Sequence, residues 1–352
     1  MTRSPRPTLS KVAEAAGVAV STASLVFSGS GPVAEATRRR VLDAAARLGY
    51  AGPNPVARSL RQGMSGIVGV LIGERLLHAF RDPVAVALLD GLTEELAPAG
   101  FGLLLLSGSS GRAGPTVEQV ERAPLDAVVV ESGGGDEPVL AALRRRGVPV
   151  IGVEGPRLPD VPLVRIDNYG ATVELTRHLL ELGHSRISVV TLPLGAGNPR
   201  GRLTAEHRAN ATAATCVDRL RGVEEALGRE APAWQAGNGL IEEGRRAGRE
   251  LLSGRNRPTA IIAQSDLLAV GVVQAAREFG LRVPEDLSVA GFDGIDTPWL
   301  ADLRLTTVEQ PMTEKGRAAG RLLVEVLAGA RPDGVQLPTV LRTGTSTGPV
   351  PR

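Results

Sequence analysis

The sequence is poor in cysteine, in aromatic residues and in long hydrophobic runs. Cys216 is the only cysteine among 352 residues, so no disulfide can form within the chain, and a disulfide-stabilised scaffold is excluded. Apolar stretches such as residues 102–106 and 127–130 fall far below the roughly 20 residues that cross a bilayer. No basic-then-apolar segment indicates a signal peptide. With 43% apolar and 22% charged residues, the composition is that of a globular chain, and we expect a soluble cytoplasmic protein without a membrane partner.

Patterns of common catalytic and metal sites are also missing. The four histidines and the single cysteine match no metal-binding spacing, and the glycine runs at 108–114 and 133–135 lack the order of a phosphate-binding loop. Residues 344–348 spell GTSTG, which matches the GxSxG nucleophile elbow. The sequence ends at Arg352, which leaves no room for the helix that this chemistry needs. We therefore predict neither an enzyme nor a cofactor or metal site.

Positive charge is concentrated near the N-terminus. The whole chain carries +2, but residues 1–62 contain nine Lys and Arg against three Asp and Glu, which leaves −4 for residues 63–352. A basic head on a mildly acidic body is expected when one end meets nucleic acid. Lys11 and Lys315 are the only lysines.

Three short helices are predicted in this basic segment. Apolar residues recur at helical spacing over residues 9–16, where Thr8 or Ser10 can cap the first turn. A tight glycine turn leads to a second helix over residues 20–28, and a third follows over residues 34–48. Three short helices with a tight turn between the first two describe a helix-turn-helix.

The second helix has a small, uncharged outer face. Its inner, core-forming side is predicted to contain Val20, Ala23, Val26 and Phe27, whereas the outward residues are Ser21, Leu25 and Ser28, with Ser24 on the flank. Such a face fits the DNA major groove, because hydroxyls can hydrogen-bond base edges or phosphates and Leu25 can contact a thymine methyl. A three-helix packing module with an ordinary solvated face is the alternative interpretation.

Residues 54–63 encode a helix of about two turns, with Asn54 as N-cap, Pro55 in the first turn and Gly63 at the end. A helix this short is not stable alone in water, so we expect it to form only when something packs on it. Its apolar face suits pairing with a second copy and insertion of Leu60 into a minor groove. A plain interdomain linker is the alternative.

A series of short motifs runs through the first 60 residues: Thr8-Leu9, Ala16-Gly17-Val18, Leu48-Gly49-Tyr50 and Ala57-Arg58-Ser59-Leu60. Together they resemble the headpiece and hinge of the lactose-repressor and galactose-repressor (LacI/GalR) family of bacterial transcription regulators. The resemblance implies that residues 20–28 form the recognition helix. The DNA-binding residues predicted here are Thr8, Ser10, Val20, Ser21, Thr22, Ser24, Leu25, Ser28, Asn54, Ala57 and Leu60.

Four positions depart from the family pattern. Ala19 stands where the family usually has a capping serine, and Leu25 stands where many members have an arginine. Gly52 is an additional residue before the hinge, and Pro55 is unusual within it. We therefore expect DNA binding of the family type with an operator preference of its own.

From residue 66 onward, short apolar runs alternate with helical patterns, which predicts parallel sheets covered on both faces by helices. About 290 residues are too many for one such sheet, so we expect an α/β domain of two lobes with a cleft between them. The resemblance implies a periplasmic-binding-protein-like domain. The predicted division is an all-α helix-turn-helix headpiece over residues 1–52, a hinge over 53–63, and an effector-binding and dimerisation domain over 64–352.

Ligands of such sheets bind beyond the carboxyl ends of the strands, so polar residues after strands are the candidates. Charged groups there can hold a hydroxylated ligand, although each can instead be a helix cap or a surface charge. Those that follow predicted strands are Glu131, Asp167, Ser265, Asp266 and Asp293, with capping favoured for Asp266. Arg219, near the start of a predicted helix, is a further candidate.

The resemblance narrows these candidates. Residues 219–222 resemble the effector-contacting arginine motif of the family, and residues 291–293 resemble its pocket aspartate. Residues 82–85 stand where the family often has Asn-Pro and pocket aromatics, which favours a ligand other than a typical pyranose. The predicted effector-binding residues are Asp82, Val84, Asp167, Arg219, Ser265 and Asp293.

Residues 194–215 show no clear periodicity, and long irregular loops are commonly functional or disordered. We expect a mobile flap over the effector cleft.

Taken together, these features predict a homodimeric transcriptional repressor that binds a near-palindromic double-stranded operator and a sugar-like effector. Effector binding can weaken or strengthen DNA binding, and the absence of a leucine-heptad tail favours a dimer over a tetramer. The alternatives are a transporter's sugar-binding protein, which would need an export signal and no basic head, and an architectural DNA-binding protein that has lost its ligand.

Overall fold

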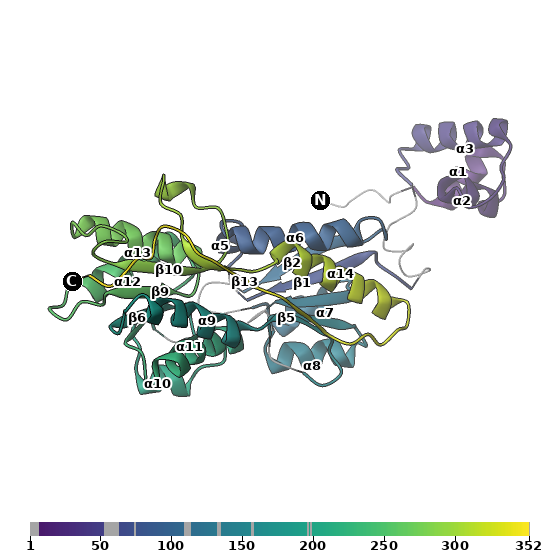
Figure 1. Ribbon diagram of the computed structural model, residues 1–352. Helices are drawn as coiled ribbons and strands as arrows, with labels where there is room; N and C mark the ends of the chain where they lie inside the picture. Colours follow the sequence, from purple (N-terminus) through teal and green to yellow (C-terminus); the bar gives the residue numbers. More distant parts are fainter. Residues whose placement is uncertain are drawn as a thin grey trace. The chain divides into compact units, whose positions relative to one another are not determined.

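A computed structural model describes residues 7–52, 63–73, 75–108, 114–131, 135–155, 158–195, 197 and 199–351. The chain divides into two compact units, Met1–Gly66 and Ile67–Arg352, whose elements are labelled in Figure 1. The expected hinge helix, with Asn54, Ala57 and Leu60, lies outside the described residues apart from Gly63.

The first unit contains the three predicted helices, which are α1 (Leu9–Ala16), α2 (Val20–Ser28) and α3 (Glu35–Leu48). Each helix ends at a glycine in the left-handed conformation, with φ between 64° and 67°. Only glycine adopts this conformation without steric cost. The hydroxyl of Thr8 caps α1 by accepting a hydrogen bond from the Lys11 amide, whereas Ala19, the N-cap residue of α2, forms no side-chain capping bond.

Small aliphatic side chains fill the centre of this unit, among them Ala23 and Val26 of α2. Phe27 packs edge-on against Tyr50, with ring centroids 5.4 Å apart. One expectation for α2 was wrong. Val20 is 47% exposed and does not belong to the core, because it lies in the first turn of the helix. Leu25, expected on the outer face, is half-buried and is not part of the core cluster.

The second unit contains two sheets. The first sheet is parallel throughout and has the order β12-β5-β4-β3-β1-β2. Its strands are β1 (Ile67–Ile72), β2 (Gly102–Ser107), β3 (Ala127–Glu131), β4 (Val150–Val153), β5 (Leu163–Ile166) and β12 (Val335–Leu337). Its helices are α5 (Leu76–Ala79), α6 (Pro83–Leu96), α7 (Val117–Arg122), α8 (Glu137–Arg145) and α14 (Met312–Leu327). Helices α6 and α14 share one core with the sheet, and α7 and α8 share another.

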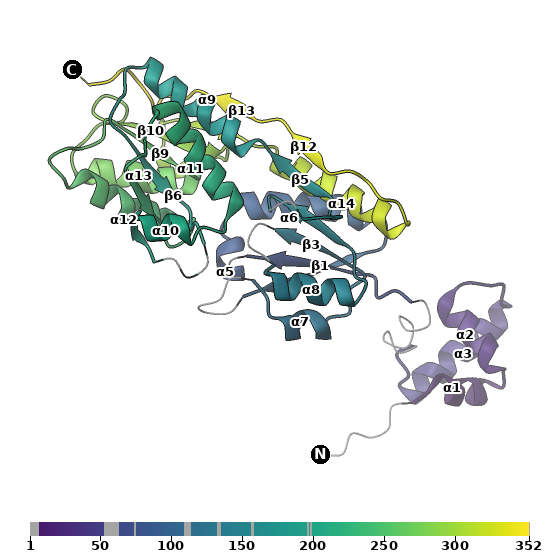
Figure 2. The same cartoon turned by 90° about the horizontal axis from the view of Figure 1, so that it is seen from below.

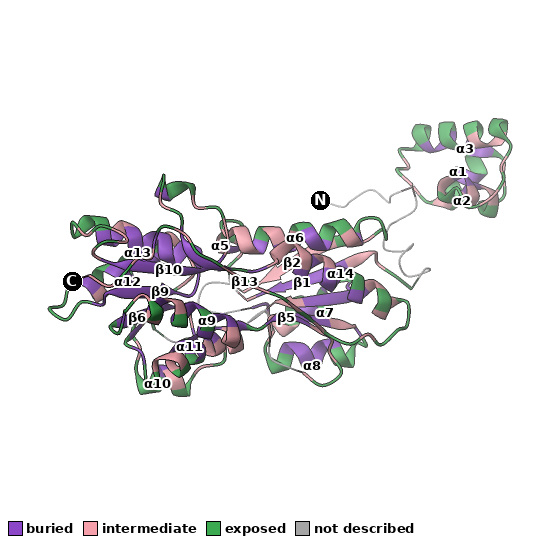
Figure 3. Ribbon diagram, in the orientation of Figure 1, coloured by how far each residue is buried: buried purple, intermediate pink, exposed green. Residues whose placement is uncertain are grey.

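The second sheet has the order β13-β11-β10-β9-β6-β8-β7 and is antiparallel only at its two edges. Its strands are β6 (Ile187–Thr191), β7 (Gly201–Arg202), β8 (Ala233–Gln235), β9 (Ala260–Ala263), β10 (Ser288–Asp293), β11 (Thr306–Glu309) and β13 (Val340–Arg342). Its helices are α9 (Asn168–Glu181), α10 (Ala205–Ala209), α11 (Ala214–Leu227), α12 (Ile241–Leu252), α13 (Asp266–Glu278) and the short 3-10 helix η1 (Pro298–Leu300). Helices α9 and α11 share one hydrophobic core with this sheet, and α12 and α13 share another. Figure 3 shows the buried residues concentrated in the strands and on the helix faces turned toward them.

The chain passes between the two sheets after β5, after β11 and between β12 and β13. In Figure 2 the last of these passages is the yellow segment that runs from β12 to β13. The predicted two-lobed α/β architecture is confirmed. Residues at the first two passages, 166–168 and 309–312, lie where the lobes meet.

The expectation for residues 194–215 was wrong. This segment contains β7 and α10, and α11 begins within it at Ala214. The amides of Thr212 and Ala213 donate to the carbonyl of Leu194, and Arg208 forms two hydrogen bonds with Glu224 of α11. A capping box at α10 and these contacts attach the described residues of this segment to the edge of the second sheet, which does not fit a loop without regular structure.

Candidate functional site

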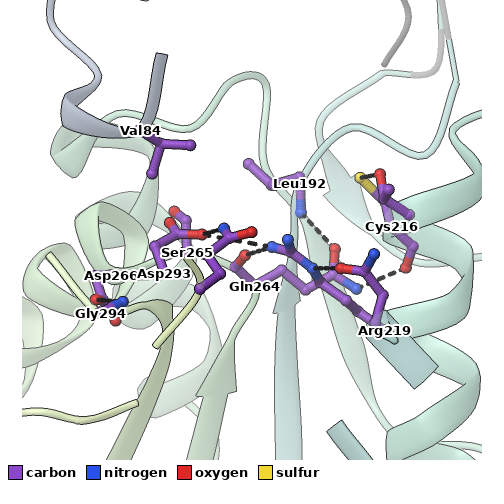
Figure 4. Close-up of polar contacts among 12 residues, drawn as sticks. Val84, Leu192, Cys216, Arg219, Gln264, Ser265, Asp266, Asp293 and Gly294 are labelled. Atoms are coloured by element: carbon purple, nitrogen blue, oxygen red, sulfur yellow. Dashed lines mark hydrogen bonds and ion pairs between the residues drawn. The ribbon is translucent and has the colours of Figure 1, made fainter. Parts of the chain in front are cut away.

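Arg219 lies on α11 and is held by contacts on several sides. Its Nε donates to Oδ1 of Asn168 at 2.8 Å, and its Nη1 donates to the carbonyl of Gln264 at 2.6 Å. The guanidinium carbon lies 3.6 Å from the centroid of the Phe292 ring, and Nη1 lies 3.8 Å from Oδ1 of Asp293. Figure 4 shows Arg219 with Gln264 and Asp293 near the ends of the second-sheet strands. Only 6% of Arg219 is exposed, so the guanidinium group has a fixed orientation.

A second cation, Lys315 of α14, is completely buried. Its ammonium group lies 2.5 Å from Oε1 of Glu154 and donates to Oε1 of Gln310 at 2.6 Å. The amide nitrogen of Gln310 donates to Oδ1 of Asp293 at 2.5 Å, and Oε2 of Glu154 accepts a hydrogen bond from Asn168 at 2.7 Å. Every one of these side chains is therefore paired within the cluster.

These contacts close a ring of six side chains, which we call the inter-lobe ring: Arg219, Asn168, Glu154, Lys315, Gln310 and Asp293. Glu154 and Lys315 come from the first sheet and its helix α14, whereas Arg219 and Asp293 come from the second sheet and α11. The two amide residues lie at the passages between the lobes. The ring therefore joins both lobes and both passages through buried polar contacts.

Two more carboxyl groups lie near the ring. Glu131 ends β3, and burial raises its pKa to about 7, with repulsion from Asp82 adding to the rise and attraction from Lys315 opposing it. Asp82 caps α6 by accepting a hydrogen bond from the Val84 amide at 2.9 Å. Burial raises the pKa of Asp82 as well, opposed by that amide and by Arg219. The neighbourhood of the ring thus combines two buried cations with an excess of carboxyl groups.

Asp293 is 7% exposed and adopts a positive φ of 126° at the end of β10. Burial raises its pKa well above the usual range, and the positive charge of Arg219 is the largest influence opposing this rise. A non-glycine residue in this backbone region is strained, and such strain concentrates at functional sites.

Two further candidate residues, like Asp82, are N-caps of helices. Ser265 is the N-cap of α13, and its hydroxyl accepts a hydrogen bond from the Leu268 amide at 3.2 Å. Asp167 is exposed and caps α9 through the Gly170 amide at 2.9 Å, while its neighbour Asn168 is the residue that enters the ring. The capping role favoured for Asp266 was therefore wrong, because Ser265 performs it.

Asp266 instead fixes the segment that follows β10. Its carboxylate accepts hydrogen bonds from the amides of Gly294 and Ile295 at 2.8 and 2.9 Å and from the Thr307 hydroxyl at 2.7 Å. Burial raises the pKa of Asp266 to about 7, and these hydrogen bonds oppose the rise. Asp266 thereby supports the position of Asp293, the residue just before Gly294.

Sequence reasoning missed four members of the ring: Glu154, Asn168, Gln310 and Lys315. Glu154 and Gln310 directly follow β4 and β11, so the rule that selected Glu131 would have found both. Asn168 is adjacent to the selected Asp167. Lys315 lies in the first turn of a helix, and its only sequence signal is that lysine is so rare in this chain.

The serine of the GTSTG motif is structural. Ser346 is fully buried, its hydroxyl donates to the carbonyl of Val289 at 2.6 Å, and it accepts a hydrogen bond from the Thr306 amide at 2.8 Å. Within the described residues, no group of three or more His, Cys, Asp or Glu is placed to hold a metal ion. In the same part of the chain, no single helix is long and apolar enough to cross a membrane.

The outer face of α2 contains hydroxyl groups and no charged side chain. Ser21 and Ser28 are exposed, whereas Thr22 and Ser24 are half-buried. Thr8 and Ser10 at the start of α1 are exposed as well. Because no side chain caps α2, its first backbone amides are available to an anion such as a phosphate group.

Comparisons with known proteins agree with this architecture. Residues 8–54 match the bacterial regulatory proteins of the lacI family, and residues 176–347 match the periplasmic binding protein-like domain. A helix-turn-helix joined to such a domain defines a class of DNA-binding transcriptional regulators rather than enzymes. An HTH-type transcriptional regulator of Mycolicibacterium smegmatis is 35% identical over 99% of this chain and 100% of its own length. The chain belongs to the LacI family.

Solved structures of similar fold include two from this family. The complex of the transcriptional regulator CelR with cellobiose is 30% identical, with a TM-score of 0.67 over 97% of this chain and 100% of that one. The lac repressor dimer bound to operator and the anti-inducer ONPF shares the fold at 23% identity, with a TM-score of 0.74 over 98% of this chain and 100% of that one.

Proposed function

We propose that this protein is a homodimeric transcriptional repressor whose operator affinity is controlled by a hydroxylated small molecule bound beside the inter-lobe ring. The observation that carries the effector part is the buried pair of Arg219 and Asp293, which lies at the carboxyl ends of the second-sheet strands. In parallel sheets this is the edge at which ligands bind.

The pair suits a ligand with neighbouring hydroxyl groups. The two hydrogen bonds of Arg219 described above use Nε and Nη1 and leave Nη2 for a ligand, and the hydrogen bond from Gln310 to Asp293 uses Oδ1 and leaves Oδ2. The guanidinium group can donate a hydrogen bond to one hydroxyl of the ligand, and the carboxylate can accept a hydrogen bond from the adjacent hydroxyl. The cellobiose bound by CelR supports a sugar or sugar derivative as the ligand class.

DNA binding belongs to the headpiece. The hydroxyl-bearing face of α2 and the uncapped start of that helix support insertion into a major groove, with backbone amides near a phosphate. The positive surplus of residues 1–62 supplies attraction to the phosphate backbone, so operator affinity should fall steeply with salt. A second copy of the chain would place two headpieces on a near-palindromic site.

Control of DNA binding would pass through the lobes. A ligand that binds better to one lobe arrangement shifts the population toward that arrangement. The ring connects the ligand-facing residues to the first two passages between the sheets, so a change at Arg219 or Asp293 alters the constraint on both passages.

The test has two parts and uses the full-length protein. Selection of bound sequences from random DNA should yield a near-palindromic site, and its failure would contradict the DNA-binding role. The selected operator, fluorescently labelled, is then titrated with the protein in the presence of cellobiose, ribose and a panel of other neutral sugars. A change of operator affinity with one of them supports the effector role. Indifference to the whole panel would contradict it and favour an architectural DNA-binding protein.

A further inference from the structure

Building on the proposed effector site, we propose that Lys315 is a positioning residue for effector binding. Its ammonium group joins Glu154 to Gln310, and each of these holds one side of the ring. Through Gln310 it orients Asp293, and through Glu154 and Asn168 it orients Arg219. Lys315 itself then need not contact the effector.

The burial of Lys315 requires a specific reason. The chain uses arginine almost everywhere, yet one of its two lysines has 0% exposure and lies between the Glu154 carboxylate and the side-chain amide of Gln310. Burying an ammonium group is costly unless it is paired and hydrogen-bonded. Burial lowers the pKa of Lys315, and the adjacent Glu154 opposes this change. A buried apolar residue would avoid the cost, so the retained charge indicates a role beyond packing.

The Glu154 carboxylate contacts residues of three segments, α14, β5 and α9. Oε1 lies 2.5 Å from the Lys315 ammonium of α14 and accepts a hydrogen bond from the backbone amide of Ile166 in β5 at 3.0 Å. Oε2 accepts from Asn168 at the start of α9. Glu154 is one of the few non-glycine residues with positive φ, at 53°, which indicates that the surrounding contacts fix its backbone.

Gln310 forms the opposite connection. Its side chain accepts from Lys315 and donates to Asp293, while its backbone amide donates to the carbonyl of Asp293 at 3.2 Å. Gln310 lies at the second passage between the sheets, and residues 166–168 lie at the first. A single ammonium group therefore restrains both passages and both ligand-facing side chains.

A double variant separates positioning from stability. Lys315→Met alone leaves the mostly buried Glu154 carboxylate without its cation, so it should lower the thermal midpoint. Adding Glu154→Gln removes the second charge, and its side-chain carbonyl can still accept from the Ile166 amide. The double variant Lys315→Met/Glu154→Gln should therefore recover most of the lost thermal midpoint but still leave Gln310 without its partner.

The readout is amide hydrogen exchange in the full-length protein without any sugar. In the double variant, peptides covering residues 307–314 should exchange about tenfold faster than in the wild type, although the thermal midpoint is similar. The matched control is Glu94→Gln. Glu94 of α6 forms an exposed ion pair, 2.6 Å long, with Arg317 of α14, the helix that carries Lys315, and the loss of this pair should leave the exchange unchanged. Wild-type exchange in the double variant would overturn the proposal.

Gln310→Leu tests the other end of the connection and covers the case in which the double variant does not fold. It keeps Lys315 paired with Glu154 but separates this pair from Asp293. Exchange in peptides covering residues 290–296 should rise by a similar factor, and unchanged exchange there would also overturn the proposal. Because no sugar is present, both results are independent of the effector titration, so the two proposals can fail separately.

Discussion

The central guanidinium carbon of Arg219 lies 3.6 Å from the centroid of the Phe292 ring, and Oδ1 of Asp293, the next residue, lies 3.8 Å from Nη1 of the same arginine. Consecutive residues of one strand thus provide a stacking surface and a counter-charge. Arginine suits this position because its planar group can stack and donate in several directions at once. The planar shape of the guanidinium group, and not only its charge, should therefore matter for effector binding.

Arg219→Lys should therefore weaken the effector response while leaving operator affinity in the absence of effector within about twofold of wild type. A lysine keeps the positive charge near Asp293 but loses the planar fork and the contact with Phe292. Hydrogen bonds to charged groups contribute about 1.5–3 kcal/mol, which corresponds to a rise of roughly 10- to 100-fold in the sugar concentration at half response. The measurement is operator binding by fluorescence anisotropy across a titration with the responding sugar.

Arg221→Lys is the matched control, because Arg221 lies on the same helix but is exposed. Its response should equal that of the wild type. An unchanged response in Arg219→Lys would remove Arg219 from the effector site.

Glu131 predicts a pH dependence of stability. Its pKa is about 7 in the folded protein against an ordinary value of 4.5, chiefly because of burial, with Asp82 raising it further and Lys315 opposing. The folded state therefore binds the proton more tightly than the unfolded state. The stability from this group is complete below pH 4.5 and is lost as pH rises to about 7.

Glu131→Gln should remove this loss, which amounts to about 1–3 kcal/mol at 1.36 kcal/mol per pKa unit. Urea unfolding of both proteins at pH 5, 6, 7 and 8 checks the prediction. Asp82, Asp266 and Asp293 contribute to the pH dependence of both proteins, so the informative quantity is the difference between the two curves. Parallel curves would show that Glu131 does not titrate in this range.

Much of the fold was accessible from the sequence because the long elements have strong periodicity and clear ends. The helices of the headpiece end at Gly17, Gly29 and Gly49, each of which was identifiable as a stop. Strands β8, β12 and β13 span only three residues each, too few for a periodic pattern, and their pairing in the sheets depends on distant parts of the chain.

The site was only partly accessible for a related physical reason. The resemblance to the family singled out Arg219 and Asp293, but rules based on local sequence could not distinguish a helix cap from a buried contact, as Asp167 and Ser265 show. The ring depends on long-range pairing, since Lys315 and Glu154 are 161 positions apart in the sequence. No local pattern predicts that a lysine in a helix will be buried against a carboxylate from another segment.

Leu60→Ala tests the predicted wedge at the operator centre, a residue outside the described part of the chain. Inserting an apolar side chain between base steps favours sites that kink easily, so its loss should weaken specific binding much more than non-specific binding. The expected loss is about tenfold or more on the selected operator and less than about twofold on random DNA at the same salt concentration. Equal losses on both DNAs would rule out the wedge.

Ala19→Ser should stabilise the headpiece, because Ala19 is the N-cap of α2 and has no side chain that can accept a hydrogen bond. Its backbone is already extended, with φ of −66° and ψ of 149°, which suits a capping hydroxyl. A serine cap contributes about 1 kcal/mol, so amide exchange across residues 20–28 of the full-length protein should slow about fivefold. Thr8→Ala, which removes the existing cap of α1, should speed exchange in residues 9–16 by a similar factor. If Thr8→Ala has its expected effect and Ala19→Ser does not, the start of α2 is limited by something other than its missing cap.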